Sequence, residues 1–324
     1  MIDPLLSGAL IFSSLLSLLS IGLTLTYMTT KVPNFAHASL AAVGAYVTLT
    51  TVELLGGSPY FFLPLAFIIG GLIGLVQYSI IFKPLIRRGV NIVGLMVATL
   101  AMEFIFLSLL NIYADSLSRE LKIRSRYFLL AIRDFEFAGI PGLLIVGLIL
   151  VVATATALYL FLTKTKFGIA IRAAIEDPSL ASVVGVNVNR VYTVSWLIAG
   201  ALGALSGALL PLWFAGNPDL GSKLIVSVFA ASIIGGLGNV YGAVLGGFLI
   251  GFAELLGTNL LANQFGSWVI PYRPLIPLVA IVITLMLAPK GILGVDWKAI
   301  ATRLRKRINR LLKFRHKIAQ LEPK

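Results

Sequence analysis

The strongest constraint on the fold is a succession of apolar runs, most of them long enough to cross a lipid bilayer. A hydrocarbon core about 30 Å thick needs roughly 20 helical residues. Hydropathy and its breaks place the runs at residues 4–28, 32–55, 60–82, 90–113, 140–163, 191–215, 224–237, 240–256 and 272–288. We therefore predict an all-α, polytopic integral membrane protein with eight or nine transmembrane helices.

The seventh run differs from the others because it is short and because Gly235, Gly236 and Gly238 interrupt it. A broken or re-entrant helix within 224–242 is expected there. Proteins tolerate such backbone at membrane depth only where other protein or a water-filled cavity covers it. Whether this segment crosses fully decides between eight and nine helices.

Composition excludes most other classes of protein. Of 324 residues, 58% are hydrophobic and 12% are charged, whereas soluble domains have about 45–50% apolar and about 25% charged residues. Disorder is excluded as well, because it needs low hydrophobicity. The chain has no cysteine and only two histidines, His37 and His316, so we expect no disulfide, no thiol nucleophile and no Cys-based or His-based metal site.

Basic residues cluster in the connections after the third and fifth runs and after the ninth. The positive-inside tendency places all three on the cytoplasmic side of the plasma membrane, with the N-terminus outside and the C-terminus inside. Residues 114–138 then lie outside, where acidic side chains offset the basic ones. The basic residues of the first two connections are Lys83, Arg87 and Arg88, and Lys164, Lys166, Arg172 and Arg190.

The chain is predicted to divide into a transmembrane domain, 1–296, and a basic amphipathic tail, 297–324. In the tail, apolar residues recur on one helical face and the net charge of +13 is concentrated. We expect the tail to contact anionic lipid rather than nucleic acid, because it follows directly on a span. Its predicted membrane-surface residues are Arg303, Arg305, Lys306, Arg307 and Arg310.

The cytoplasmic loop 164–190 has the signals of two short helices, 169–176 and 178–184. Asp177 is a good N-cap, Pro178 suits the first helical position, and Gly185 suits the stop. One interpretation is a docking helix that receives motion from another subunit, and the alternative is an ordinary structured loop. Small residues would let a partner approach closely, namely Ala173, Ala174, Ala181 and Ser182.

Few polar residues lie inside the predicted spans. A charge at mid-membrane costs about 2.5–3.5 kcal/mol, so Glu103, near the middle of its run, should face protein or water. It either lines a path for solute or belongs to a buried structural pair. Asn34 and His37 lie near the end of their run and are expected to form hydrogen bonds at a helix entry. The candidate residues of a translocation path are Asn34, His37, Gln77 and Glu103.

Three motifs are absent from the sequence. It contains no G-x-x-x-x-G-K-[ST] phosphate loop, so we expect no ATPase site on this chain. The glycine-rich stretch 235–242 follows no strand pattern, which favours close helix packing over a dinucleotide site. No carboxylate pair or Ser/His/Asp set indicates hydrolysis. The sequence therefore predicts a protein that is not an enzyme.

Four stretches resemble permeases of branched-chain amino-acid ABC importers, of the LivH/LivM type. Residues 27–37 read YMTTKVPNFAH and precede Gly44-Ala45-Tyr46. Residues 172–177 read RAAIED, and Gly185-Val186-Asn187 follows at 185–187. Residues 237–243 read LGNVYGA, and 289–294 read PKGILG. The four matches occur in the family's order and span nearly the whole chain.

The resemblance implies a division of labour among subunits. Such a permease pairs with a second permease, sister or identical, and works with two ATP-binding subunits and an extracytoplasmic solute-binding protein. ATP and Mg would then be bound by the partner subunits, with no cofactor on this chain. The family's coupling loop to the ATPase corresponds here to Arg172, Ala173, Glu176, Asp177, Gly185 and Arg190.

Other functions compete with this interpretation. A permease for another small solute, such as urea or a simple sugar, would share the same architecture. A single-chain secondary transporter would need ion-carrying groups at mid-membrane, and only Glu103 clearly offers one. A membrane enzyme would need a clustered polar site, and a scaffold would bind partners without solute-dependent ATP turnover.

Overall fold

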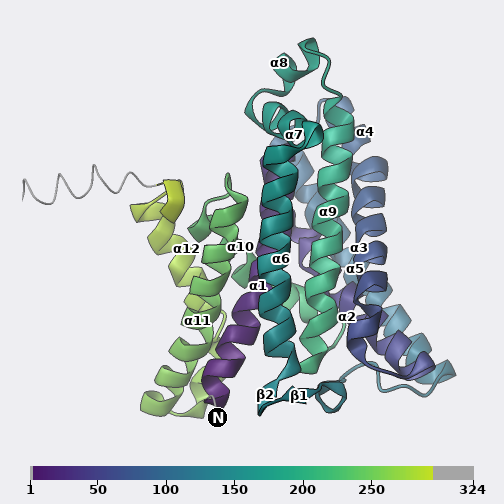
Figure 1. Cartoon of the computed structure of the whole chain (residues 1–324), viewed down its shortest axis with the longest axis vertical. Coiled ribbons are helices and arrows are strands. Elements are labelled where there is room, and N and C mark those ends of the chain that lie inside the picture. The colour runs from purple at the N-terminus through teal and green to yellow at the C-terminus, as the bar shows by residue number, and fades with distance from the viewer. Residues whose placement is uncertain (1–2, 295–324) are drawn as a thin grey trace, which may run out of the picture.

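The computed structural model describes residues 3–294, which form a bundle of long helices (Figure 1). The α-helices are α1 (Pro4–Thr30), α2 (Ser39–Leu55), α3 (Leu63–Val76), α4 (Lys83–Arg87), α5 (Ile92–Glu120), α6 (Gly142–Lys164), α7 (Lys166–Glu176), α8 (Pro178–Val183), α9 (Val188–Leu209), α10 (Leu220–Gly235), α11 (Val240–Phe265) and α12 (Leu275–Leu287). A π-helix, η3 (Gln77–Phe82), joins α3 to α4. The strands β1 (Glu136–Phe137) and β2 (Ile140–Pro141) pair antiparallel.

The predicted all-α, polytopic architecture is confirmed. Within residues 3–294, eight helical segments are long and apolar enough to cross a membrane, and the short seventh run is α10, with 16 residues. Several predicted limits were wrong: α5 continues to Glu120, α11 continues to Phe265, and the second span becomes α-helical only at Ser39. The predicted tail 297–324, with Arg303, Arg305, Lys306, Arg307 and Arg310, lies outside the described residues.

The bundle contains an inverted repeat, which the sequence analysis did not predict. Helices α1, α2, α3 and α5 correspond in order to α9, α10, α11 and α12. In both halves a non-helical stretch separates the first helix from the second. The first half begins at the end that holds the N-terminus and the second at the end that holds α8 (Figure 1). The packing repeats too, because α3 packs mainly on α9 and α11 mainly on α1.

Small residues allow these helix pairs to approach closely. On α3, a Cβ at Gly74 would overlap the carbonyl oxygen of Trp196 on α9. On α11, a Cβ at Gly251 would lie 2.5 Å from the Cα of Ser13 on α1. Backbone therefore meets backbone at both contacts, and α1 is the most deeply buried of the spans.

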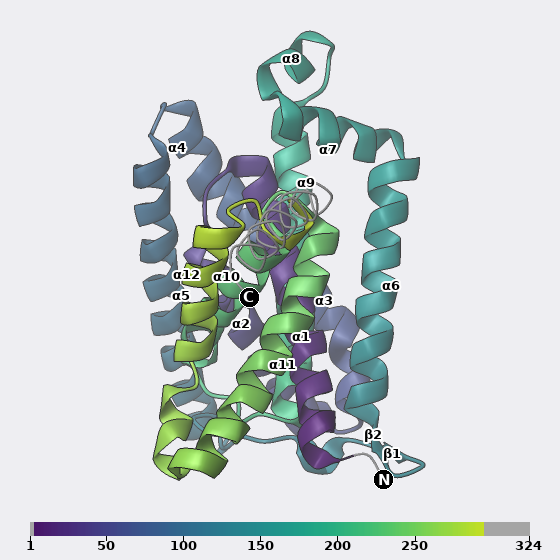
Figure 2. The ribbon, with the colours of Figure 1, turned by 90° about the vertical axis from the view of Figure 1, so that its left-hand side faces the viewer.

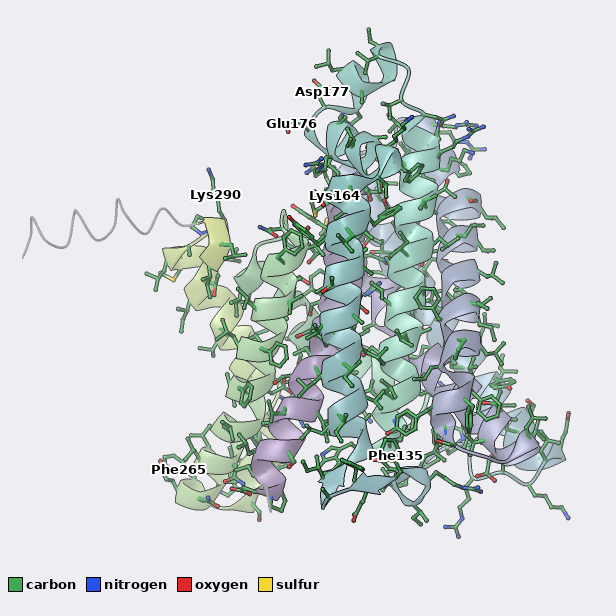
Figure 3. The ribbon with its side chains drawn as sticks, in the orientation of Figure 1. Phe135, Lys164, Glu176, Asp177, Phe265 and Lys290 are labelled. Carbon is green, nitrogen blue, oxygen red and sulfur yellow. The ribbon has the colours of Figure 1, made fainter. Side chains whose placement is uncertain are left out.

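Different connections lie at the two ends of the bundle. Figure 3 shows Lys164, Glu176, Asp177 and Lys290 at one end and Phe135 and Phe265 at the other. The connections around α4 and around α7 and α8 share an end (Figure 1), as the positive-inside argument requires. Helix α7 lies across this end of the bundle, between α6 and α9, and carries α8 farthest from the centre (Figure 2).

Candidate functional site

The helix α2 begins deep inside the bundle and not at its end. Residues 31–34 leave α1 without helical structure, and the 3-10 turn η1 (Phe35–His37) follows. Nε2 of His37 lies 3.0 Å from the carbonyl oxygen of Leu19, which is in the middle of α1. As expected, Asn34 and His37 lie at the start of the second span, Phe35–Leu55, and the non-helical segment places this start beside the middle of α1.

The helix α10 also begins inside the bundle, next to the start of α2. A Cβ on Gly221 would lie 2.5 Å from the Cα of Ser39, so only glycine permits this approach. The N-termini of two interrupted helices thus meet at depth. Each helix N-terminus carries a partial positive charge, and interrupted helices of this kind hold ligands in membrane transporters.

Glu103 of α5 accepts hydrogen bonds from the first turns of both α2 and α10. The hydroxyl of Ser39 donates to Oε2 at 2.5 Å, and the hydroxyl of Ser222 donates to Oε1 at 2.7 Å. Glu103 is half-buried. The carboxylate therefore faces polar groups of the protein, as the sequence predicts for a charge within an apolar run.

Gln77 lies in a different part of the molecule. It lines a cavity of about 530 Å³ between α2, α3, η3 and α5, which opens to the surface where Leu72 and Ile80 are exposed. The side chain is 2% exposed, and neither of its amide atoms has a hydrogen-bond partner among the described residues. The cavity is otherwise apolar, with walls formed by Val43, Val47, Ile73, Met102, Phe106, Leu110 and others. Asn34 likewise has both amide atoms buried without a partner.

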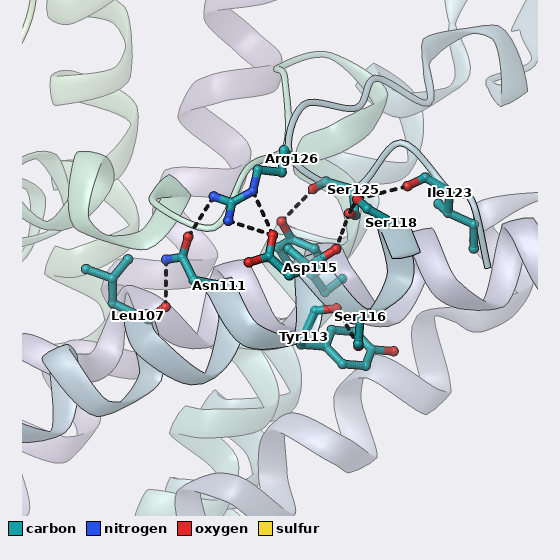
Figure 4. A network of polar contacts seen from close by, with 11 residues as sticks. Leu107, Asn111, Tyr113, Asp115, Ser116, Ser118, Ile123, Ser125 and Arg126 are labelled. Atoms are coloured by element: carbon teal, nitrogen blue, oxygen red, sulfur yellow. Dashed lines mark hydrogen bonds and ion pairs between the residues drawn. The ribbon is translucent and has the colours of Figure 1, made fainter. Parts of the chain in front are cut away.

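A polar network holds the loop after α5 against the end of that helix (Figure 4). Arg126 donates to Asp115 at 2.9 and 2.6 Å and to Asn111 at 3.1 Å. The hydroxyl of Tyr46, a residue of the cavity wall, donates to the backbone carbonyl of Ser125 at 2.6 Å. These contacts fix the loop next to the part of the cavity that Tyr46 lines.

One buried ion pair was not predicted. Nε of Arg273 donates to Oε1 of Glu254 at 2.7 Å, and Ser227 donates to the other carboxylate oxygen at 2.7 Å. Glu254 lies within the predicted run 240–256, where a charged residue needs a partner, but the sequence does not indicate which residue that is. Arg273 is the second residue of the last predicted run, 272–288, and local sequence does not reveal which helix such a residue contacts.

The two helices predicted in the loop 164–190 are confirmed as α7 and α8. Helix α7 starts at Lys166, three residues earlier than predicted, because Thr165 caps it by accepting from the amide of Gly168. The carboxylate of Asp177 accepts from the amides of Ser179 and Leu180 at 2.8 and 3.0 Å. Gly185 has φ of +88°, the left-handed conformation expected at a helix stop.

The loop also exposes apolar side chains that our sequence analysis passed over. Leu180, Val183 and Val184 are 63, 83 and 71% exposed. The predicted coupling residues Arg172, Glu176, Asp177, Gly185 and Arg190 are exposed as well, and Ala173 is half-buried. The suggestion that Ala174 and Ala181 admit a partner was wrong, since both are buried within this chain. The sequence signal for this exposed surface was the presence of Leu180, Val183 and Val184 in the short second helix of the loop and beside it.

An inverted repeat of spanning helices, interrupted around polar groups at depth, is the architecture of a membrane transport protein. The family model described as branched-chain amino acid transport system / permease component matches residues 5–288. The chain therefore belongs to this family, and the predicted resemblance is confirmed.

Individual relatives agree with the family model. The chain is 45% identical over 295 residues to the probable branched-chain amino acid transport permease protein LivH of Methanocaldococcus jannaschii, which covers 91% of this chain and 93% of the relative. It is 25% identical to the permease BraD of Pseudomonas aeruginosa, with 89% and 94% covered, and 26% identical to LivH of Salmonella typhimurium, with 86% and 91% covered. No solved structure matches.

Proposed function

We propose that this chain is the membrane-spanning permease subunit of an ATP-driven importer of branched-chain or other hydrophobic amino acids. The observation that carries the proposal is 45% identity, over nine-tenths of the chain, to a permease named for branched-chain amino acid transport. The apolar cavity of about 530 Å³ supports the same class of solute, because small-molecule sites are mostly apolar with few polar groups.

The energy source in this proposal lies on two ATP-binding partner subunits, which hold ATP and Mg, while this chain holds no cofactor. Helices α7 and α8 seat on such a partner. Three exposed apolar side chains on and beside α8 support this role, because exposed apolar patches mark interaction surfaces. ATP binding then shifts the permease between two states through their different affinities for the partner.

The α7–α8 end is cytoplasmic in this proposal, and the opposite end receives an extracytoplasmic solute-binding protein. The basic connections at the α7–α8 end support this orientation in the plasma membrane. A second permease, sister or identical, completes the path. The long exposed faces of α5 and α12 are available for that partner and for lipid.

The proposal is tested by expressing the chain with candidate ATP-binding subunits and measuring co-purification and leucine uptake in liposomes. Val183→Asp is expected to lose the ATP-binding subunits and ATP-driven uptake, since it places a charge in the docking surface. Ile132→Asp is the matched control for co-purification of the ATP-binding subunits, because Ile132 is 97% exposed and lies three residues before Phe135, which Figure 3 shows at the opposite end of the bundle. Leucine transport by the purified chain alone, driven by an ion gradient, would instead support a secondary transporter.

A further inference from the structure

Glu103 meets two serines where α2 and α10 begin, and a lysine follows one of these serines in the chain. We call Ser39, Glu103, Ser222 and Lys223 the mid-membrane cluster. Ser39 and Ser222 each donate a hydrogen bond to one oxygen of Glu103. Lys223 follows Ser222 directly on the first turns of α10. The two opposite charges therefore lie on adjoining helices at the same interruption of the fold.

The cluster lies near the middle of the bilayer. Glu103 is about 17 Å along α5 from Ile92, counted at about 1.5 Å per residue, in a hydrocarbon core about 30 Å thick. His37, two residues before Ser39, contacts α1 at Leu19, which is also near the middle of that helix. Gly221 packs on Ser39 and brings the start of α10 to this depth.

The charges of the cluster are available to a ligand. Ser222 and Lys223 are exposed, and Glu103 is half-buried. Neither Glu103 nor Lys223 has an ion-pair partner among residues 3–294, and Asp219, one turn before Lys223, is not paired with it. Each oxygen of Glu103 accepts one hydrogen bond and retains a further lone pair. Exposed charges at this depth belong in a polar path, because hydrocarbon does not solvate them.

We propose that the mid-membrane cluster binds the charged end of a zwitterionic amino acid during its passage. Glu103 accepts hydrogen bonds from the α-ammonium group. Lys223 binds the α-carboxylate, with support from the positive N-terminal end of α10. This assignment rests on the function proposed above and adds to it the recognition of both charges of the solute by one chain.

The apolar cavity lies beside the cluster and suits the side chain of such a solute. Val43 is one helical turn beyond Ser39 on α2, and Phe106 is one turn beyond Glu103 on α5. Both residues line the cavity of about 530 Å³, as does Met102. A branched aliphatic side chain therefore enters the cavity when the charged end occupies the cluster.

The test uses the complete transporter, with its ATP-binding and permease partners, in lipid nanodiscs without the solute-binding protein. Saturation binding is measured for leucine, for leucinamide, which lacks the carboxylate, and for 4-methylpentanoate, which lacks the ammonium group. The variants are Glu103→Gln and Lys223→Met. Glu120→Gln and Lys122→Met are matched controls, because both residues are exposed at or beyond the end of α5. Unchanged basal ATP hydrolysis shows that each variant assembles.

The wild type is expected to bind leucine at least ten-fold more tightly than either analogue. In Glu103→Gln the preference over 4-methylpentanoate should fall to within about two-fold, while the preference over leucinamide remains. Lys223→Met should show the reverse. A structural defect would weaken all three solutes together, and that result, or unchanged preferences, overturns the proposal. The proposed function fails separately, through absence of ATP-driven leucine uptake by the wild-type transporter in liposomes.

Discussion

Arg273 and Glu254 form an ion pair in the interior, with 2.7 Å between Nε and Oε1. The Arg273 guanidinium carbon also lies 4.4 Å from the ring centroid of Phe12 on α1. The pair connects the start of α12 to α11, and Ser227 of α10 donates to the same carboxylate. Four helices thus depend on one buried charge pair.

Replacing one member of this pair is expected to destabilise the fold. Glu254→Ala leaves Arg273 charged without a partner, which costs about 3 kcal/mol, the lower end for a buried pair, because Arg273 retains 24% side-chain exposure. The double variant Glu254→Leu/Arg273→Met should recover most of that loss. Thermal unfolding in detergent measures both, and equal losses in the single and double variants would contradict the prediction.

Glycine contacts between helices give a second prediction. A Cβ on Gly246 of α11 would overlap the carbonyl oxygen of Ala231 on α10. Gly246→Ala should therefore cost about 1–3 kcal/mol, the range for overpacking a close contact. Gly238→Ala is the matched control, because nothing lies within 4 Å of its Cβ position. The difference in unfolding temperature between the two variants is the measurement.

The cap of α8 gives a third prediction, which separates the hydrogen bonds of Asp177 from its charge. Asp177→Ala removes both amide contacts and should cost the helix about 1 kcal/mol. Asp177→Asn retains an accepting oxygen and should preserve the helix. We expect ATP-driven uptake to fall in the alanine variant and to stay near the wild-type rate in the asparagine variant. Equal loss in both would show that the charge matters instead.

Gln77 provides the fourth prediction. A buried amide without partners costs about 1–3 kcal/mol, so Gln77→Leu should raise the unfolding temperature. π-Helical turns occur often at functional sites, and we expect the same variant to reduce leucine uptake. Ile80→Leu, on the same cavity wall, serves as the control. A variant that gains no stability would show that the amide already has a partner in the membrane.

Local sequence patterns were sufficient for the presence of the spans and for the two short helices of the loop 164–190. Long apolar runs predict spanning helices because an unpaired backbone is not tolerated in lipid. Asp177 and Gly185 predict helix ends because their chemistry acts within a few residues. Both signals depend only on neighbours in the chain.

The interior site was only partly predictable. Glu103 was identified because a charge within an apolar run is costly wherever it lies. Its contacts with Ser39 and Ser222 join three separate helices, and no local pattern encodes them. The apolar run 32–55 also concealed a non-helical entry, although Pro33 and Asn34 were visible within it. Hydropathy reports the surroundings of a segment but not its backbone conformation.

The backbone contacts of α3 with α9 and of α11 with α1 constrain how this molecule deforms. Because no side chains separate these helices where they touch, each pair has little room to slide and is expected to tilt as a stiff unit. Bending is then concentrated where α2 and α10 start. In the proposed function, α9 would transmit a displacement of α8 toward the centre of the bundle, and bending at the starts of α2 and α10 would open the path toward one face of the membrane at a time.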